Sequence, residues 1–140
     1  MKLIYILLPF LLLCSCSEDD DPVIIEEEDH SVKIEAYYTL KNDNRLYNDV
    51  DSDVFIYYGI YSSHLLEYDT FEDGVWSNEE GELRPDLHFK IDSEGKCEFI
   101  SKRYDEIIMI LLVSKYYNMM AHTGFSSSKP GTSAKFIFNN

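Results

Sequence analysis

Apolar and polar residues alternate with a period of two along much of the chain after residue 30. In SVKIEAYYTL (31–40) the even-numbered residues are apolar, and most of the odd-numbered ones are polar. Successive side chains of a strand point to opposite faces, so this pattern predicts a half-buried strand. Three further segments show the same alternation, DVFIYYGIY (53–61), DLHFKID (86–92) and KCEFI (96–100). The segment AKFIFN (134–139) closes the series of predicted strands.

The segment EIIMILLVSKYY (106–117) is apolar on both faces and rich in β-branched residues near its start. These features favour a central strand, with a helix as the alternative. Between the third and fourth alternating segments lies SEG (93–95). This short spacing and Gly95 favour a hairpin, in which Cys97 and Phe99 face the core.

About seven short strands separated by turn signals predict an all-β domain, an antiparallel β-sandwich over residues 32–140. The chain has 140 residues, of which 45% are hydrophobic. A chain of this length buries one substantial core and not two, so we expect a single domain.

The first fifteen residues have the pattern of an export signal. Lys2 supplies a positive start, and an apolar run follows from Leu3 to Leu13, interrupted by Pro9. This run is shorter than the roughly 20 residues that a membrane-spanning helix needs. We therefore predict a signal peptide over residues 1–15, the alternative being a buried N-terminal strand or helix.

The sequence Leu13-Cys14-Ser15-Cys16 resembles the bacterial lipobox. The resemblance implies that Cys16 is acylated and becomes the mature N-terminus, because a small residue, Ser15, precedes it and Leu13 stands two positions further back. Cys14 would leave with the signal peptide. Several acyl chains form a stable anchor, whereas one chain binds a membrane only marginally. We expect no intramolecular disulfide, because Cys97 is the one other cysteine of the mature chain.

The acidic run SEDDD (17–21) follows Cys16 directly. It resembles the export signal of Bacteroidota lipoproteins, which implies a lipid-anchored position on the outer face of the outer membrane. The alternatives are a periplasm-facing lipoprotein and a plain solvated linker. Residues 16–31 contain few aliphatic side chains and are predicted to act as an acidic tether ahead of the domain.

A second resemblance covers the strands around residue 95. FKIDSEGKCEF (89–99), followed by an aliphatic strand, resembles transthyretin-like or carboxypeptidase regulatory-like domains, which are Ig-like sandwiches. Asp92, Gly95 and Phe99 stand at the places of that pattern. The chain departs from it after Phe99, where SKRYDE replaces a Pro-Gly turn. The resemblance implies a non-catalytic accessory or adhesive module.

Charge and candidate ligands narrow the possible functions. The formal net charge is −14, which disfavours a nucleic-acid partner. Asp49, Asp51 and Asp53 alternate and could offer carboxylates to calcium, but Val54 and Ile60 stand where a calcium loop of the helix–loop–helix type has Gly and Glu. A solvated turn is the alternative. The four histidines also lack the spacing of metal ligands. We predict no metal ligand, no cofactor and no catalytic residue.

The long segment between residues 62 and 85 carries the candidate binding residues. Tyr68, Phe71 and Trp76 lie there among acidic residues, and long loops on a rigid scaffold often bind partners. The alternative is that Phe71 and Trp76, with Leu65 and Leu66, form extra edge strands or plug one end of the sandwich.

Taken together, these patterns predict a surface lipoprotein that acts as a non-catalytic binding or accessory module for a glycan or a protein. One alternative is a small hydrolase that pairs a carboxylate from Asp49 to Asp53 with Glu79, Glu80 or Glu82. Another is a structural subunit of a surface assembly completed by strand exchange.

Overall fold

The computed structural model describes residues 30–139, which form eleven strands and one short 3-10 helix. The predicted signal peptide, Cys16 and most of the tether lie outside the described residues. The elements in chain order are β1 (Ser31–Tyr38), β2 (Tyr47–Asn48), β3 (Asp53–Tyr58), η1 (Ser62–Glu67), β4 (Thr70–Glu72), β5 (Val75–Asn78), β6 (Gly81–Leu83), β7 (Leu87–Lys90), β8 (Lys96–Ile100), β9 (Ile108–Val113), β10 (Met120–Phe125) and β11 (Thr132–Phe138). The predicted all-β class is confirmed.

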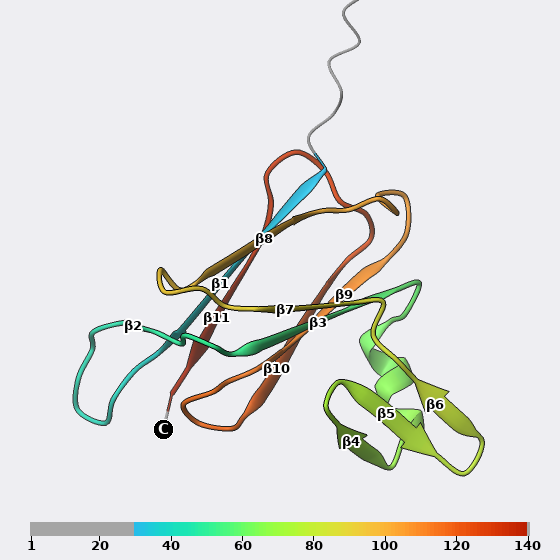
Figure 1. Cartoon of the computed structure of the whole chain (residues 1–140), viewed down its shortest axis with the longest axis horizontal. Coiled ribbons are helices and arrows are strands. Elements are labelled where there is room, and N and C mark those ends of the chain that lie inside the picture. The colour runs from blue at the N-terminus through green and yellow to red at the C-terminus, as the bar shows by residue number, and fades with distance from the viewer. Residues whose placement is uncertain (1–29, 140) are drawn as a thin grey trace, which may run out of the picture.

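Two four-stranded sheets form the body of the domain (Figure 1). The first sheet has the order β11-β1-β2, with β8 pairing the first half of β1, and the second has the order β10-β9-β3-β7. The main core lies between them. It combines inward residues of β1, β8 and β11 with those of β3 and β9. The arrangement is that of two layers packed face to face, like a sandwich.

The burial of individual strands follows the alternation in the sequence. Val32, Ile34 and Ala36 of β1 are all 0% exposed, whereas Lys33 between them is exposed. Strand β9 lies between β10 and β3 and is buried on both faces, so the prediction of a central strand is confirmed and the helical alternative is wrong.

Strand pairing differs from a purely antiparallel sandwich at one place. β1 and β11 are parallel, with Val32 opposite Thr132 and Tyr38 opposite Phe138. The first and last strands of the domain therefore run side by side, with nearly the whole domain as their connection. The remaining strands beyond the expected seven are short or weakly patterned. In β10, for example, half-buried and exposed residues alternate without a fully buried position.

The predicted hairpin between the segments 86–92 and 96–100 is wrong, although its turn forms. The Oδ1 atom of Asp92 accepts the backbone N–H groups of Glu94 and Lys96, and Gly95 has φ +80°. However, β7 pairs with β3 in the second sheet and β8 pairs with β1 in the first. The turn therefore carries the chain from one layer to the other.

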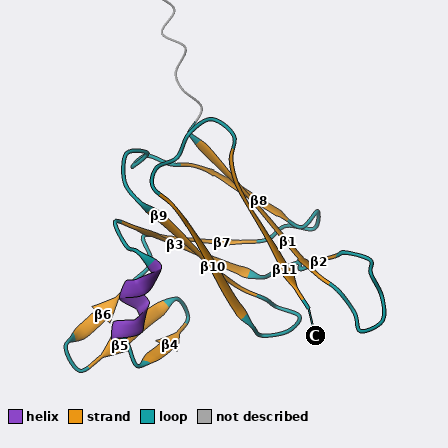
Figure 2. Ribbon diagram, turned by 180° about the vertical axis from the view of Figure 1, so that it is seen from behind, coloured by secondary structure: helices purple, strands orange, loops and turns teal. Residues whose placement is uncertain are grey.

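A small lobe, residues 59–86, covers the outer face of the second sheet (Figure 2). It consists of η1 and the three-stranded sheet β4-β5-β6. Phe55 and Tyr57 of β3, which point away from the main core, are 4% and 0% exposed because this lobe covers them. Together with Met109 and Leu111 of β9 they form a second core. This second core explains why β9 is apolar on both faces.

Candidate functional site

All three predicted contact residues lie in the small lobe, and two of them face each other. Phe71 on β4 and Trp76 on β5 are opposite in the ladder, with ring centroids 4.7 Å apart. Both are half-buried and pack against the second core. Tyr68 follows η1, is also half-buried, and makes no ring contact with this pair. The lobe thus forms extra strands over a sheet face, and a ligand-binding role for these residues stays a prediction.

The buried hydroxyl of Tyr57 fastens this lobe to the sheet. It donates a hydrogen bond of 2.5 Å to the carbonyl oxygen of Gly74. The Trp76 indole N–H is buried nearby and forms no hydrogen bond of ordinary geometry. Burial raises the pKa of the Tyr57 hydroxyl to about 12, an effect that the adjacent indole partly offsets.

The three alternating aspartates have separate roles. Asp49 is 1% exposed, and its Oδ1 atom accepts the backbone N–H of Tyr116 at 3.1 Å. Asp51 occupies a turn position with φ +63°. Burial opposes ionisation of Asp53, yet hydrogen bonds from Lys90 and His88 hold the pKa of its carboxyl below the usual value. In residues 30–139 no three His, Cys, Asp or Glu side chains are grouped so as to hold a metal ion.

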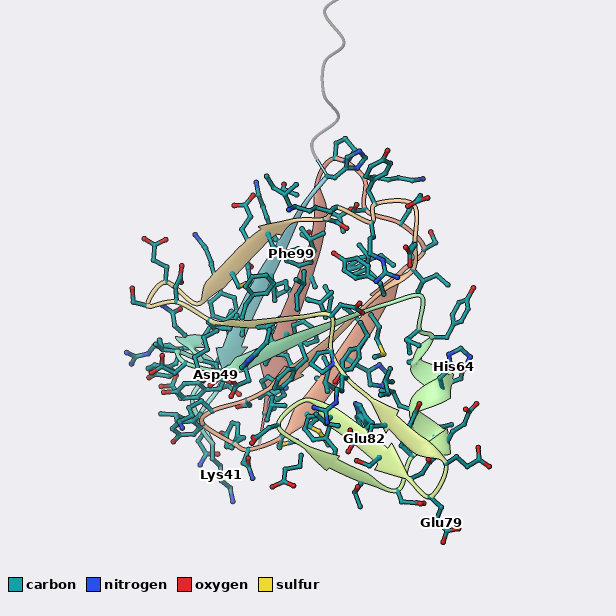
Figure 3. The ribbon with its side chains drawn as sticks, turned by 45° about the vertical axis from the view of Figure 1, so that its right-hand side comes forward. Lys41, Asp49, His64, Glu79, Glu82 and Phe99 are labelled. Carbon is teal, nitrogen blue, oxygen red and sulfur yellow. The ribbon has the colours of Figure 1, made fainter. Side chains whose placement is uncertain are left out.

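The fold separates Asp49 from two of the glutamates that the hydrolase alternative names. Figure 3 shows Asp49 on one side of the domain, and Glu79 and Glu82 in the small lobe on the other. Glu82 forms an ion pair with Arg84 at 2.5 Å. This arrangement does not place Asp49 beside Glu79 or Glu82.

A cluster of partly exposed aromatic rings was not among the residues predicted from the sequence. Four tyrosines meet at one end of the sandwich, and we call them the tyrosine platform: Tyr38, Tyr47, Tyr116 and Tyr117. The ring of Tyr38 is stacked between two others, with Tyr116 at 3.9 Å and Tyr47 at 5.5 Å between centroids. Tyr117 lies edge-on to both Tyr38 and Tyr116.

Two connections, β1–β2 and β9–β10, build the platform. Tyr38 ends β1, Tyr47 begins β2, and Tyr116 and Tyr117 occupy the loop between β9 and β10. Figure 1 shows that this end of the domain is opposite the end at which β1 begins. Seven residue steps of β1 separate Ser31 from Tyr38, which corresponds to roughly 23 Å along an extended strand.

Hydrogen bonds hold the platform in one conformation. Two side chains accept backbone N–H groups of the loop after β9. Asp49 Oδ1 accepts that of Tyr116, and Ser52 Oγ accepts that of Lys115 at 2.8 Å. The Tyr117 hydroxyl donates to the carbonyl oxygen of Thr39 at 2.5 Å. A rigid aromatic surface binds a partner with little loss of conformational entropy.

The rim of the platform combines apolar and charged groups. Tyr116 is 51% exposed, Leu46 and Met119 on the same two connections are 45% and 47% exposed, and Val50 just after β2 is 39% exposed. The Tyr47 hydroxyl donates to Asp43, and this hydrogen bond raises the pKa of Tyr47. The backbone N–H of Arg45, and then the Tyr47 hydroxyl, lower the pKa of Asp43. Aromatic, Met and Arg side chains are the types enriched in protein interfaces.

Two sequence features mark the platform in retrospect. The pairs Tyr37-Tyr38 and Tyr116-Tyr117 both stand at or just after the end of a strongly patterned strand. Tyrosines at strand ends lie where the loops of a sandwich gather. Which strand ends share one end of the domain depends on strand pairing, and this information is absent from the local pattern.

Comparisons with protein-family models, with curated proteins and with solved structures give no match. Among residues 30–139 no helix has the length and apolar character needed to span a bilayer.

Proposed function

We propose that this protein is a non-catalytic binding module, held on the outer surface of a bacterial cell by acyl chains on Cys16, that contacts a protein partner through the tyrosine platform. The observation that carries the proposal is the rigid stack of Tyr47, Tyr38 and Tyr116, which ends in a half-exposed ring. Exposed apolar and aromatic patches on soluble proteins often mark interaction sites.

The position of the platform supports this function. The lipobox resemblance and the acidic run after Cys16 put the anchor on the N-terminal side of Ser31, and the platform lies a strand length away from that residue. A module anchored in this way presents the platform to its surroundings. The resemblance of residues 89–99 to transthyretin-like accessory domains also supports a module without chemistry of its own.

Site-specific photo-crosslinking on intact cells tests the proposal. The full chain carries a benzophenone amino acid in place of Tyr116, or in place of Tyr61 as the matched control. Tyr61 is a tyrosine of the small lobe that is 59% exposed. We expect a discrete crosslinked protein from position 116 and none from position 61.

An affinity measurement completes the test. With the captured protein purified, Tyr116→Ala should weaken binding by about tenfold or more, because centrally placed tyrosines in interfaces contribute most of the binding energy. Tyr61→Ala should leave the affinity unchanged. Equal crosslinking from both positions, or a glycan rather than a protein as the bound species, would contradict a protein partner at the platform.

A further inference from the structure

A pocket lies at the open side of the sandwich, and we call it the edge cleft. It has a volume of about 370 Å³ and lies between β7, the edge strand of the second sheet, and β8, an edge strand of the first. Its walls include Leu87 and Phe89 from β7, and Phe99 and Ile100 from β8. Figure 3 labels Phe99 on β8. The volume is within the range of small-molecule sites.

The lining of the edge cleft is mainly apolar. Phe89 and Phe99 come from opposite sheets and stack with ring centroids 5.3 Å apart. Tyr58 is 8% exposed, and its hydroxyl forms a hydrogen bond with Ser101 at 3.1 Å, so its polar group needs no ligand. Ile100 is 73% exposed at the mouth. A ligand of this cleft therefore has an apolar body.

Two cations border the cleft, and one of them already has partners. Arg103 forms ion pairs with Asp86 at 2.8 Å and with Glu106, and its guanidinium lies over the Tyr58 ring at 4.7 Å from the centroid. Lys102 is exposed at the cleft and has no ion-pair partner in residues 30–139. An ammonium group beside apolar walls complements a single negative charge at the end of an apolar body.

The strand edges themselves argue against a peptide as the occupant. The backbone N–H of Ile91 donates to the carbonyl oxygen of Ser52 in the neighbouring strand. Every second residue of an antiparallel strand directs its backbone groups to the same neighbour, so those of His88 and Lys90 point away from β3 and are unpaired. On β8 the corresponding positions are Glu98 and Ile100, because Lys96 pairs its backbone N–H and carbonyl oxygen with Asp92. Charged side chains along an edge strand disfavour the addition of another strand.

We propose that the edge cleft binds a linear aliphatic carboxylate, with its chain along Leu87, Phe89 and Phe99 and its carboxylate at Lys102. The platform lies on other connections, so this site is independent of the function proposed above. No bond forms or breaks in this binding, and the cleft acts as a carrier site for an amphipathic anion.

Calorimetric titration of the full chain tests the site, with Cys16→Ala present so that acyl chains of its own do not compete. The probes are linear carboxylates of about 6 to 14 carbons and decanol. We expect saturable binding of one carboxylate per chain, with affinity rising about fourfold per methylene until the cleft is filled. Decanol should bind about tenfold or more weakly than decanoate, because it lacks the charge.

Substitutions at two exposed residues of the cleft distinguish the contribution of the positive charge to binding from that of the apolar wall. Lys102→Gln should weaken decanoate binding by about tenfold and leave decanol unchanged, whereas Ile100→Ser should weaken both ligands. Lys115→Gln removes an exposed lysine on another loop and should change neither. Absence of saturable decanoate binding, an unchanged affinity in Lys102→Gln, or preferential binding of a strand-forming peptide would overturn the proposal.

Discussion

Gly74 lies directly against the ring of Phe55, so close that a Cβ atom at position 74 would fall 2.4 Å from Cδ1 of Phe55. The same glycine accepts the hydrogen bond of Tyr57 through its carbonyl oxygen and has φ +83°. This contact joins the Asp73-Gly74 turn of the small lobe to the outer face of β3.

Gly74→Ala should therefore destabilise the domain more than a left-handed backbone position alone explains. Overpacking against the rigid Phe55 ring adds about 1–3 kcal/mol to roughly 1–2 kcal/mol for the backbone. The measurement is the free energy of unfolding in urea. Trp76 belongs to the lobe and packs against the second core, so tryptophan fluorescence should also shift to longer wavelength when the lobe loosens.

Two other glycines supply the controls for this prediction. Gly131 has φ +78° but open space around it, so Gly131→Ala should show the backbone cost alone. Gly81 has neither a positive φ nor a close neighbour, and Gly81→Ala should change the free energy of unfolding by less than about 0.5 kcal/mol. Equal losses for positions 74 and 131 would show that the Phe55 contact contributes nothing.

Asp49→Ala should loosen the loop that carries the platform. The substitution leaves the partly buried backbone N–H of Tyr116 without its acceptor, which costs about 1 kcal/mol. Urea unfolding measures this loss, and the exposed Asn44→Ala on a neighbouring connection is the control. If calcium raises the stability of the parent protein and not of Asp49→Ala, the aspartate is a metal ligand and the interpretation as a loop anchor is wrong.

Ionisation of Tyr57 in the unfolded chain should lower the free energy of unfolding at alkaline pH. Burial raises its pKa from 10.0 to about 12 in the folded protein, so above pH 10 the unfolded chain loses the proton while the folded one retains it. The free energy of unfolding keeps the full contribution of Tyr57 below pH 10. It falls by about 1.4 kcal/mol by pH 11 and continues to fall up to about pH 12. Urea unfolding at pH 8.5 and 11 should show this increment in the parent and not in Tyr57→Phe; identical losses in the two proteins would exclude it.

Cys97 should react slowly with thiol reagents in the folded protein. Burial, and then the charge of Asp92, raise the pKa of its thiol from 9.0 to about 11. The thiolate is the reactive species, so the native rate at pH 8 should be about a hundredfold below the rate in urea. The full chain with Cys14→Ser and Cys16→Ser carries this single thiol. Similar rates in the two conditions would show that Cys97 is accessible.

The two N-terminal cysteines should behave differently in cells. If Cys16 bears the acyl chains, Cys16→Ala moves the protein from the membrane fraction to the soluble fraction, whereas Cys14→Ala leaves it on the membrane. Immunoblots of the two fractions measure the difference. Release by both substitutions or by neither would contradict acylation at Cys16.

The acidic run after Cys16 has its own test. Protease added to intact cells should degrade the parent protein and spare a variant with Asp19, Asp20 and Asp21 replaced by asparagine, provided that the variant is still anchored. Equal degradation would show that the run is only a solvated linker.

The sequence predicted the features that depend on neighbouring residues. The buried face of β1, the burial of β9 on both faces and the turn from Asp92 to Gly95 were all readable from the local pattern. Side-chain direction alternates along a strand, and a turn is set by a few adjacent residues, so no distant contact is needed to specify them. Cys16 is likewise marked by its immediate neighbours, and its acylation stays a prediction.

The tertiary structure decided which segments meet. The parallel pairing of β1 with β11, the separation of β7 and β8 into different sheets, and the platform formed by Tyr38 and Tyr116 all join residues far apart in the chain. The entropic cost of closing a long loop changes slowly with its length. The distance between two strands along the chain therefore says little about which of several possible strand pairings is more stable. Burial of complementary faces selects among them, and that selection depends on the whole domain at once.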